Sequence, residues 1–228
     1  MLFNLLSGGF NKIDFLMFLL RIPIVLISLS FHEMAHGWMA LKMGDNTAAF
    51  NGRVTMNPVK HLDPLGAVCM LIGGIGWAKP VPVNPRNFND PKKGMALTGL
   101  AGPVSNLILA FAAALMSHVT LAIGNAVIST EAQATLFSII YTFFYCFEWM
   151  NVSLAVFNLI PVPPFDGSRI FYSFLPTKYY FSVMKYERYM MIALLVLTFS
   201  GLLDGPISFI SGLIVNLFDL IIGLVPFL

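Results

Sequence analysis

Charged side chains are scarce in this sequence. Of its 228 residues, 11% are Asp, Glu, Lys or Arg and 57% are hydrophobic, whereas soluble domains carry about 25% charged residues. A chain of this composition has too few polar side chains to cover a folded core in water. The scarcity excludes an ordinary soluble domain, and the long apolar runs indicate a protein that lies in a lipid bilayer.

Cysteine, excess charge and a leader signal are also lacking. The two cysteines, Cys69 and Cys146, lie in apolar surroundings and form no CxxC pair, so we expect neither a disulfide framework nor a cysteine metal site. The net charge of +2 is small and the basic residues are scattered, which argues against a nucleic-acid partner. The first residues, MLFNLLSGGFNKIDF, have no basic segment and no small-residue cleavage site, so we expect no removed signal peptide.

Five apolar runs are candidates for membrane spans. They cover about residues 22–41, 95–123, 135–159, 189–203 and 207–228, and a crossing helix needs about 20 residues. Between the first two runs Pro and Gly recur, which predicts short extended pieces at 47–57 and 77–84 and a re-entrant or interfacial run at 64–77. The sequence therefore predicts one membrane-embedded domain over residues 1–228. It would be an all-α polytopic membrane protein with about five transmembrane helices and a short β or re-entrant segment.

Basic residues gather in two of the connecting segments. Both 42–93 and 169–188 are rich in Lys and Arg, whereas the 124–134 loop has neither. By the positive-inside rule, the two basic segments are cytoplasmic. We therefore expect a multi-pass protein of the cell membrane with its N-terminus outside and its C-terminus in the cytoplasm.

The sharpest chemical signal is the run His32-Glu33-Met34-Ala35-His36, an H-E-x-x-H pattern inside the first apolar run. Two His residues four positions apart share one helix face, which suits binding of a single Zn²⁺, and the Glu beside the first His can reach a water at the metal. Ionisable groups within a membrane span are costly and are normally functional. The pattern predicts a zinc-peptidase site that uses His32 and His36 as ligands.

A catalytic zinc needs a third protein ligand. Asp45 follows the motif but lies beyond the expected end of the helix. The better candidate is Asp166, in the run Asn158-Leu-Ile-Pro-Val-Pro-Pro-Phe-Asp166-Gly167, where three prolines and a glycine break the third span. An acidic residue at such a break can turn inward and fold back toward the depth of the motif.

Three motifs, taken in order, resemble the site-2 protease family of intramembrane zinc metalloproteases. They are HEMAH on the first span, Gly102-Pro103-Val-Ser-Asn106 on the next, and Asn158-x-x-Pro161-x-Pro163-x-x-Asp166-Gly167 on the third. The resemblance implies that His32, His36 and Asp166 bind one Zn²⁺ per chain. It also implies that Glu33 is the general base and that Asn106 helps to hold the substrate carbonyl or the oxyanion.

The segments 57–66 and 76–84 resemble the compact subgroup of that family, which has no PDZ or CBS domain. We expect the partners to be the lipid bilayer and single-span membrane proteins that serve as substrates. We expect their peptide bonds to be cut near the cytoplasmic side of the bilayer.

Other interpretations stay open on the sequence. A membrane transporter or metal carrier would use the same His and Asp residues for an ion in transit, although it has no need of Glu33. An inactive homologue would only bind membrane helices, and the intact HEMAH motif argues against it. His61 could lie near the active site or be a plain interfacial residue. His118 is expected in the helix bundle or at its interface.

Overall fold

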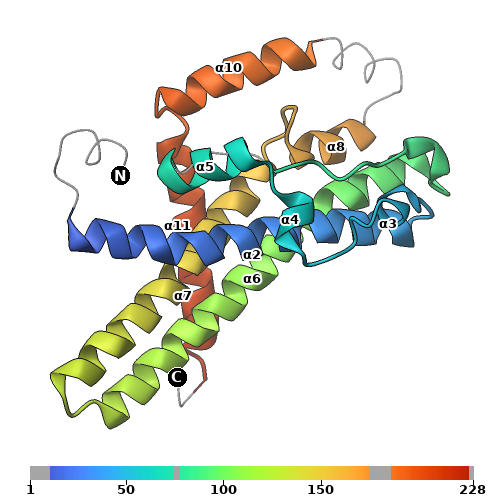
Figure 1. Cartoon of the computed structure of the whole chain (residues 1–228). Helices are drawn as coiled ribbons and strands as arrows, with labels where there is room; N and C mark the ends of the chain where they lie inside the picture. Colours follow the sequence, from blue (N-terminus) through green and yellow to red (C-terminus); the bar gives the residue numbers. More distant parts are fainter. Residues whose placement is uncertain (1–10, 74–77, 175–185, 226–228) are drawn as a thin grey trace. The chain divides into compact units, whose positions relative to one another are not determined.

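The computed structural model describes residues 11–73, 78–174 and 186–225. Gly76 and Trp77 of the 76–84 motif, and Lys178 and Lys185 of the second basic segment, lie outside the described residues. The chain divides into two compact units, Met1–Gly94 and Met95–Leu228, whose helices are labelled in Figure 1. The described residues form helices and no sheet, with one isolated antiparallel bridge between Leu62 and Ala78. The all-α prediction is confirmed.

The first unit is built on α2, Lys12–Lys42. Its start is fixed by a capping box, in which the Asn11 side chain accepts from the N–H of Asp14 and the Asp14 side chain accepts from the N–H of Asn11. After its end, Gly44 turns the chain with a φ of +107°, a conformation that other residues rarely adopt. The short helices α3 (Thr47–Phe50), α4 (Pro58–His61) and α5 (Pro64–Gly73) pack against α2.

Residues 47–50 are helical, so the prediction of an extended piece over 47–57 is wrong there. The side chain of Asp45 accepts a hydrogen bond from the backbone N–H of Thr47, with an N···O distance of 3.0 Å. Such a local bond favours a turn over an extended chain. The α5 helix matches the short apolar run expected at 64–77, and its ten residues are too few to cross a bilayer.

The second unit holds most of α6 (Pro91–Val127), together with α7 (Glu131–Asn158), α8 (Asp166–Ser173), α10 (Glu187–Phe199) and α11 (Asp204–Ile222). Helices α6, α7 and α11 share an apolar core that contains Ala110, Val152, Val156 and Val215. α11 runs antiparallel to α7 (Figure 1): Gly212 lies against Trp149, while Asp219 lies by Tyr141 and Tyr145, nearer the start of α7. The end of α11 therefore lies on the side of the α6–α7 loop.

Four of the described helices are long and apolar enough to cross a membrane: α2, α6, α7 and α11. They coincide with four of the five expected spans. The fifth expected span, 189–203, falls on α10, whose 13 residues extend about 20 Å. That is shorter than the roughly 30 Å hydrocarbon core of a bilayer.

Candidate active site

The H-E-x-x-H motif lies on the buried face of α2. His32, Glu33 and His36 are 6%, 9% and 5% exposed, and Gly37 and Ala40 continue the same face. The spacing of three and four residues brings these side chains to one side of the helix. Three ionisable groups are thus enclosed on a helix that is apolar enough to span a bilayer.

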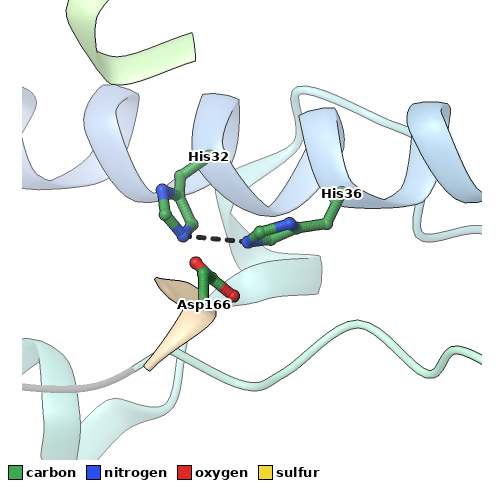
Figure 2. Close-up of side chains that lie close together, drawn as sticks. All are labelled: His32, His36 and Asp166. Atoms are coloured by element: carbon green, nitrogen blue, oxygen red, sulfur yellow. Dashed lines mark hydrogen bonds between the residues drawn. The ribbon is translucent and has the colours of Figure 1, made fainter. Parts of the chain in front are cut away.

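The imidazole rings of His32 and His36 face each other (Figure 2). Their Nε2 atoms are 3.0 Å apart, and the rings meet edge to face with centroids 4.6 Å apart. Two nitrogen ligands of one tetrahedral Zn²⁺ stand about 3.3 Å apart, given Zn–N bonds of about 2.0–2.1 Å. The pair therefore has the spacing that a shared zinc requires.

The carboxylate of Glu33 is held by the extended chain that precedes α6. The backbone N–H of Val81 donates to Oε2 of Glu33 at 3.1 Å. One turn further along α2, Gly37 leaves room for this segment, since a Cβ there would lie 3.2 Å from the Val54 side chain and 3.6 Å from that of Val81. One oxygen of Glu33 is thereby fixed by the protein backbone.

Arg53 fixes the segment that carries Val81. Its buried guanidinium donates to the carbonyl oxygens of Lys60, Lys79 and Pro80, and the Lys79 N–H donates to the carbonyl of His61 at 2.8 Å. A planar guanidinium with several donors suits a junction of backbone carbonyls. The position of the Val81 N–H therefore depends on Arg53.

Asp45 has a structural role in the first unit, where its carboxylate accepts hydrogen bonds from three other residues. Its Oδ1 accepts from the N–H and hydroxyl of Thr47 and from the Asn87 side chain at 2.8 Å, and its Oδ2 accepts from the Asn84 N–H at 2.7 Å. Burial alone would raise the pKa of Asp45, but these hydrogen bonds outweigh it and lower the pKa from the ordinary 3.8. With four donors on its two oxygens, Asp45 is a poor candidate for a metal ligand.

His61 is also held by the loops. It is fully buried, and its Nε2 lies 2.7 Å from the carbonyl oxygen of Thr55, so Nε2 carries the hydrogen and donates. Its own carbonyl accepts from Lys79. His61, the last residue of α4, therefore supports the segment beside Glu33, and its role near the active site stays a prediction.

Asp166 is the first residue of α8, directly after the break in the proline-rich run. The chain reverses tightly there, because a Cβ on Gly167 would lie 2.3 Å from the carbonyl oxygen of Leu159 and 2.7 Å from that of Ile160. Phe165 packs on Phe157, with ring centroids 4.3 Å apart. The chain therefore reverses at this break, and the Asp166 side chain is buried at 8% exposure.

Asn106 lies on the part of α6 that belongs to the second unit, and α8 belongs to the same unit. Asn106 is fully buried on α6, three positions after Pro103. Earlier on the same helix, a Cβ on Gly99 would lie 3.0 Å from the backbone oxygen of Asp166. The small residue at 99 thus lets α6 approach the first turn of α8 closely.

Three of the predicted residues are the candidate metal ligands: His32, His36 and Asp166 (Figure 2). The two histidines come from the first unit and the aspartate from the second. Each is buried and offers one donor atom of a kind that Zn²⁺ accepts, an imidazole nitrogen or a carboxylate oxygen. The donor set fits a catalytic zinc that keeps its fourth position open.

Two buried charged residues were missed by the sequence reasoning. Arg53 was counted only as one of several cytoplasmic charges, and no local pattern marks it as a junction of carbonyls. Glu148 lies within the apolar run 135–159 and is 2% exposed. An acidic residue within a span is itself a signal of function, and that signal was available in the sequence.

Comparison with known proteins decides between the open interpretations. Residues 20–200 match peptidase family M50. The chain belongs to this family. M50 is the site-2 protease family, so the resemblance carried by the three motifs is confirmed, and this M50 protein is a multi-pass membrane protein and a zinc metalloprotease. The match favours the protease interpretation over the metal carrier.

Similar curated proteins carry matching names. The chain is 41% identical over 173 residues to the candidate zinc metalloprotease YwhC of Bacillus subtilis, covering 76% of this chain and 77% of that protein. It is 30% identical over 155 residues to the candidate zinc metalloprotease Rip2 of Mycolicibacterium smegmatis, covering 66% and 55%. It is 27% identical over 156 residues to the zinc metalloprotease MJ0392 of Methanocaldococcus jannaschii, covering 68% and 34%. No solved structure gives a significant match.

Proposed function

We propose that this M50 protease cleaves transmembrane segments of other proteins within the bilayer, nearer its cytoplasmic side. The observation that carries the proposal is the buried His32, Glu33 and His36 on a helix of membrane-spanning length and hydropathy. His32 stands ten residues before Lys42, the end of α2, or about 15 Å at 1.5 Å per residue. Chemistry at that depth lies inside a hydrocarbon core about 30 Å thick.

In this proposal His32, His36 and Asp166 hold the zinc. When bound there, Zn²⁺ supplies Lewis-acid chemistry, because it polarises a carbonyl group and lowers the pKa of water. The two imidazole Nε2 atoms, 3.0 Å apart, support the first two assignments. The burial of Asp166 at a tight chain reversal supports the third.

Glu33 takes the proton from the attacking water and passes it to the leaving amine. The Val81 N–H occupies Oε2, so Oε1 is the oxygen that exchanges the proton. A fixed carboxylate of this kind suits a general base, since proton transfer depends on position as well as on pKa. Asn106, an amide donor on α6, assists by holding the substrate carbonyl or the oxyanion.

We also propose that the basic segments 42–93 and 169–188 face the cytoplasm and that the N-terminus lies outside, following the positive-inside rule. The sequence predicts a cytoplasmic C-terminus because it predicts five crossings.

Two features favour four crossings and an outer C-terminus instead. They are the antiparallel pairing of α7 with α11 and the short length of α10, which has 13 residues. Labelling of Leu228→Cys by a membrane-impermeant reagent, with Cys69 and Cys146 replaced by Ser, tests this: an outer position is labelled in intact cells, and a cytoplasmic one only after lysis.

The substrate assignment is tested on single-span model substrates whose helices carry Gly, Asn, Ser or Pro at different depths. A helix hides its carbonyls in hydrogen bonds, so these residues ease the local unwinding that attack requires. Mass spectrometry should locate the new termini inside the span, toward its cytoplasmic end. Termini found only in a soluble loop would refute intramembrane cleavage and indicate a juxtamembrane peptidase.

The ligand assignments are tested by metal analysis of purified variants. His36→Ala should lose both zinc and activity, because one of the facing nitrogens is removed. Asp166→Asn should lose nearly all activity if the carboxylate binds zinc directly. A role in orienting a histidine would lower metal affinity by only about 10- to 100-fold and leave partial activity. Asp204→Asn, at an exposed position, is the matched control and should keep both zinc and turnover.

A further inference from the structure

A second polar cluster lies in the second unit, between α6, α7 and α11. It surrounds a cavity of about 250 Å³. The polar lining residues are Ser117 and His118 from α6, Tyr141, Tyr145 and Glu148 from α7, and Asp219 from α11. None of these residues takes part in the zinc chemistry proposed above, so the cavity calls for a separate explanation.

Glu148 is the residue that needs a partner. It is 2% exposed, and its Oε1 has no hydrogen-bond partner among the described residues, although it lines the cavity. A buried carboxylate oxygen without a partner is costly in any protein and more so within a bilayer. In a native structure such an atom calls for a partner, such as a bound ion, water or ligand.

The charges around the cavity favour a cation. Nδ1 of His118 lies 3.0 Å from the carbonyl of Ala114, and its Nε2 faces Asp219 at 3.7 Å. Apart from His118, no basic side chain of the described residues lines the cavity, so an occupant with a positive charge would offset the two carboxylates of Glu148 and Asp219.

The size and the aromatic walls indicate what kind of cation. A cavity of about 250 Å³ far exceeds a bare metal ion, since one water takes about 30 Å³. In the described part of the chain, the residues that converge as metal ligands belong to the zinc site and not to this cavity. Tyr141 and Tyr145 stack with centroids 6.0 Å apart, and tyrosine rings attract organic ammonium groups.

We propose that this cavity binds an alkylammonium group, with the Glu148 carboxylate as its counter-ion and the Tyr141 and Tyr145 rings as its walls. The side chain of Asp219 is 47% exposed and lies three residues before the end of α11, so the cavity opens about 5 Å from that helix end. Both the amine of a lipid headgroup and a free small amine can reach such an opening.

The test is calorimetric titration of the purified full-length protein in detergent with n-butylammonium chloride. Saturable binding is expected, and Glu148→Gln should weaken it at least about tenfold, because a neutral amide gives no ion pair. Glu131→Gln is the matched control on the same helix at an exposed position and should bind as the parent does. n-Butanol, which has the same chain without the charge, should not bind measurably.

Thermal unfolding and zinc content of each variant report whether it is folded. If Glu148→Gln does not fold, Asp219→Asn replaces it, and a severalfold loss of affinity is expected. Equal binding of n-butanol, or unchanged affinity in the folded variants, would overturn the proposal. So would calcium binding that depends on Glu148 without any ammonium binding.

The source of the ammonium group is resolved after reconstitution into two bilayers. If a lipid headgroup is the occupant, phosphatidylethanolamine should compete with n-butylammonium and lower its apparent affinity relative to an uncharged galactolipid. If the occupant is a free amine, the affinity should be equal in the two bilayers. Absence of n-butylammonium binding in both bilayers would contradict the assignment.

Discussion

The backbone N–H of Val81 donates a hydrogen bond to the carboxylate of Glu33 at 3.1 Å, although the two residues are far apart in the chain. Val81 has no side-chain chemistry of its own. Its amide fixes one oxygen of the proposed general base and leaves the other available for the proton. The chain from 79 to 81 is therefore part of the active-site scaffold as well as a connection to α6.

Arg53→Lys tests that scaffold. Lys offers a single ammonium group and cannot reproduce the guanidinium contacts to the carbonyls of Lys60, Lys79 and Pro80. We expect a loss of about 2 kcal/mol in the free energy of unfolding and a lower cleavage rate with zinc content unchanged. Arg86→Lys, at an exposed position, is the control. If the two variants behave alike in thermal unfolding and cleavage, Arg53 does not hold the segment.

Gly167→Ala tests the chain reversal at Asp166. A Cβ there would stand 2.3 Å from a backbone oxygen of Leu159, so the turn has to open. We expect a loss of more than about 2 kcal/mol in unfolding free energy and reduced zinc binding, since Asp166 moves with the turn. Gly205→Ala provides the comparison, because nothing lies within 4 Å of its added Cβ. Stability equal to that of the Gly205 variant would show that the reversal is not tight.

The sequence alone predicted those features of the molecule that depend on local sequence patterns. HEMAH on an apolar run predicts a buried ligand pair, because residues four apart on a helix share a face whatever surrounds them. The break before Asp166 follows from three prolines, which remove donors from the helix. The family follows from these two motifs and the run at Gly102–Asn106.

The rest depended on contacts between distant segments. The pairing of Glu33 with the Val81 amide and the junction at Arg53 join residues 7 to 48 positions apart, and no periodicity encodes them. The helix at Thr47–Phe50 was missed because the Thr47 N–H donates to the Asp45 side chain just before it, a local bond that competes with an extended chain. The cavity at Glu148 needs three helices to form, and no pattern within one helix brings its polar residues together.

The hydrogen bonds to Asp45 predict an acid-dependent stability. They hold its pKa below the ordinary 3.8 although burial opposes this, so the folded protein binds that proton less readily than the unfolded chain. The stabilisation is therefore complete above about pH 4 and is lost as the pH falls through the lower folded pKa. Thermal unfolding between pH 5 and pH 2 checks this, and Asp45→Asn should reduce the slope. An equal slope in that variant would assign the acid dependence to other carboxylates.

The most direct test of the account compares the parent protein with Glu33→Gln, purified in detergent, for zinc content and for cleavage of a single-span substrate. Gln is nearly the same size and can still accept from the Val81 N–H, but it cannot take a proton from water. The account predicts full zinc occupancy and a cleavage rate lower by at least about 100-fold. Cleavage at the parental rate with zinc bound would contradict the assignment of Glu33 as the general base.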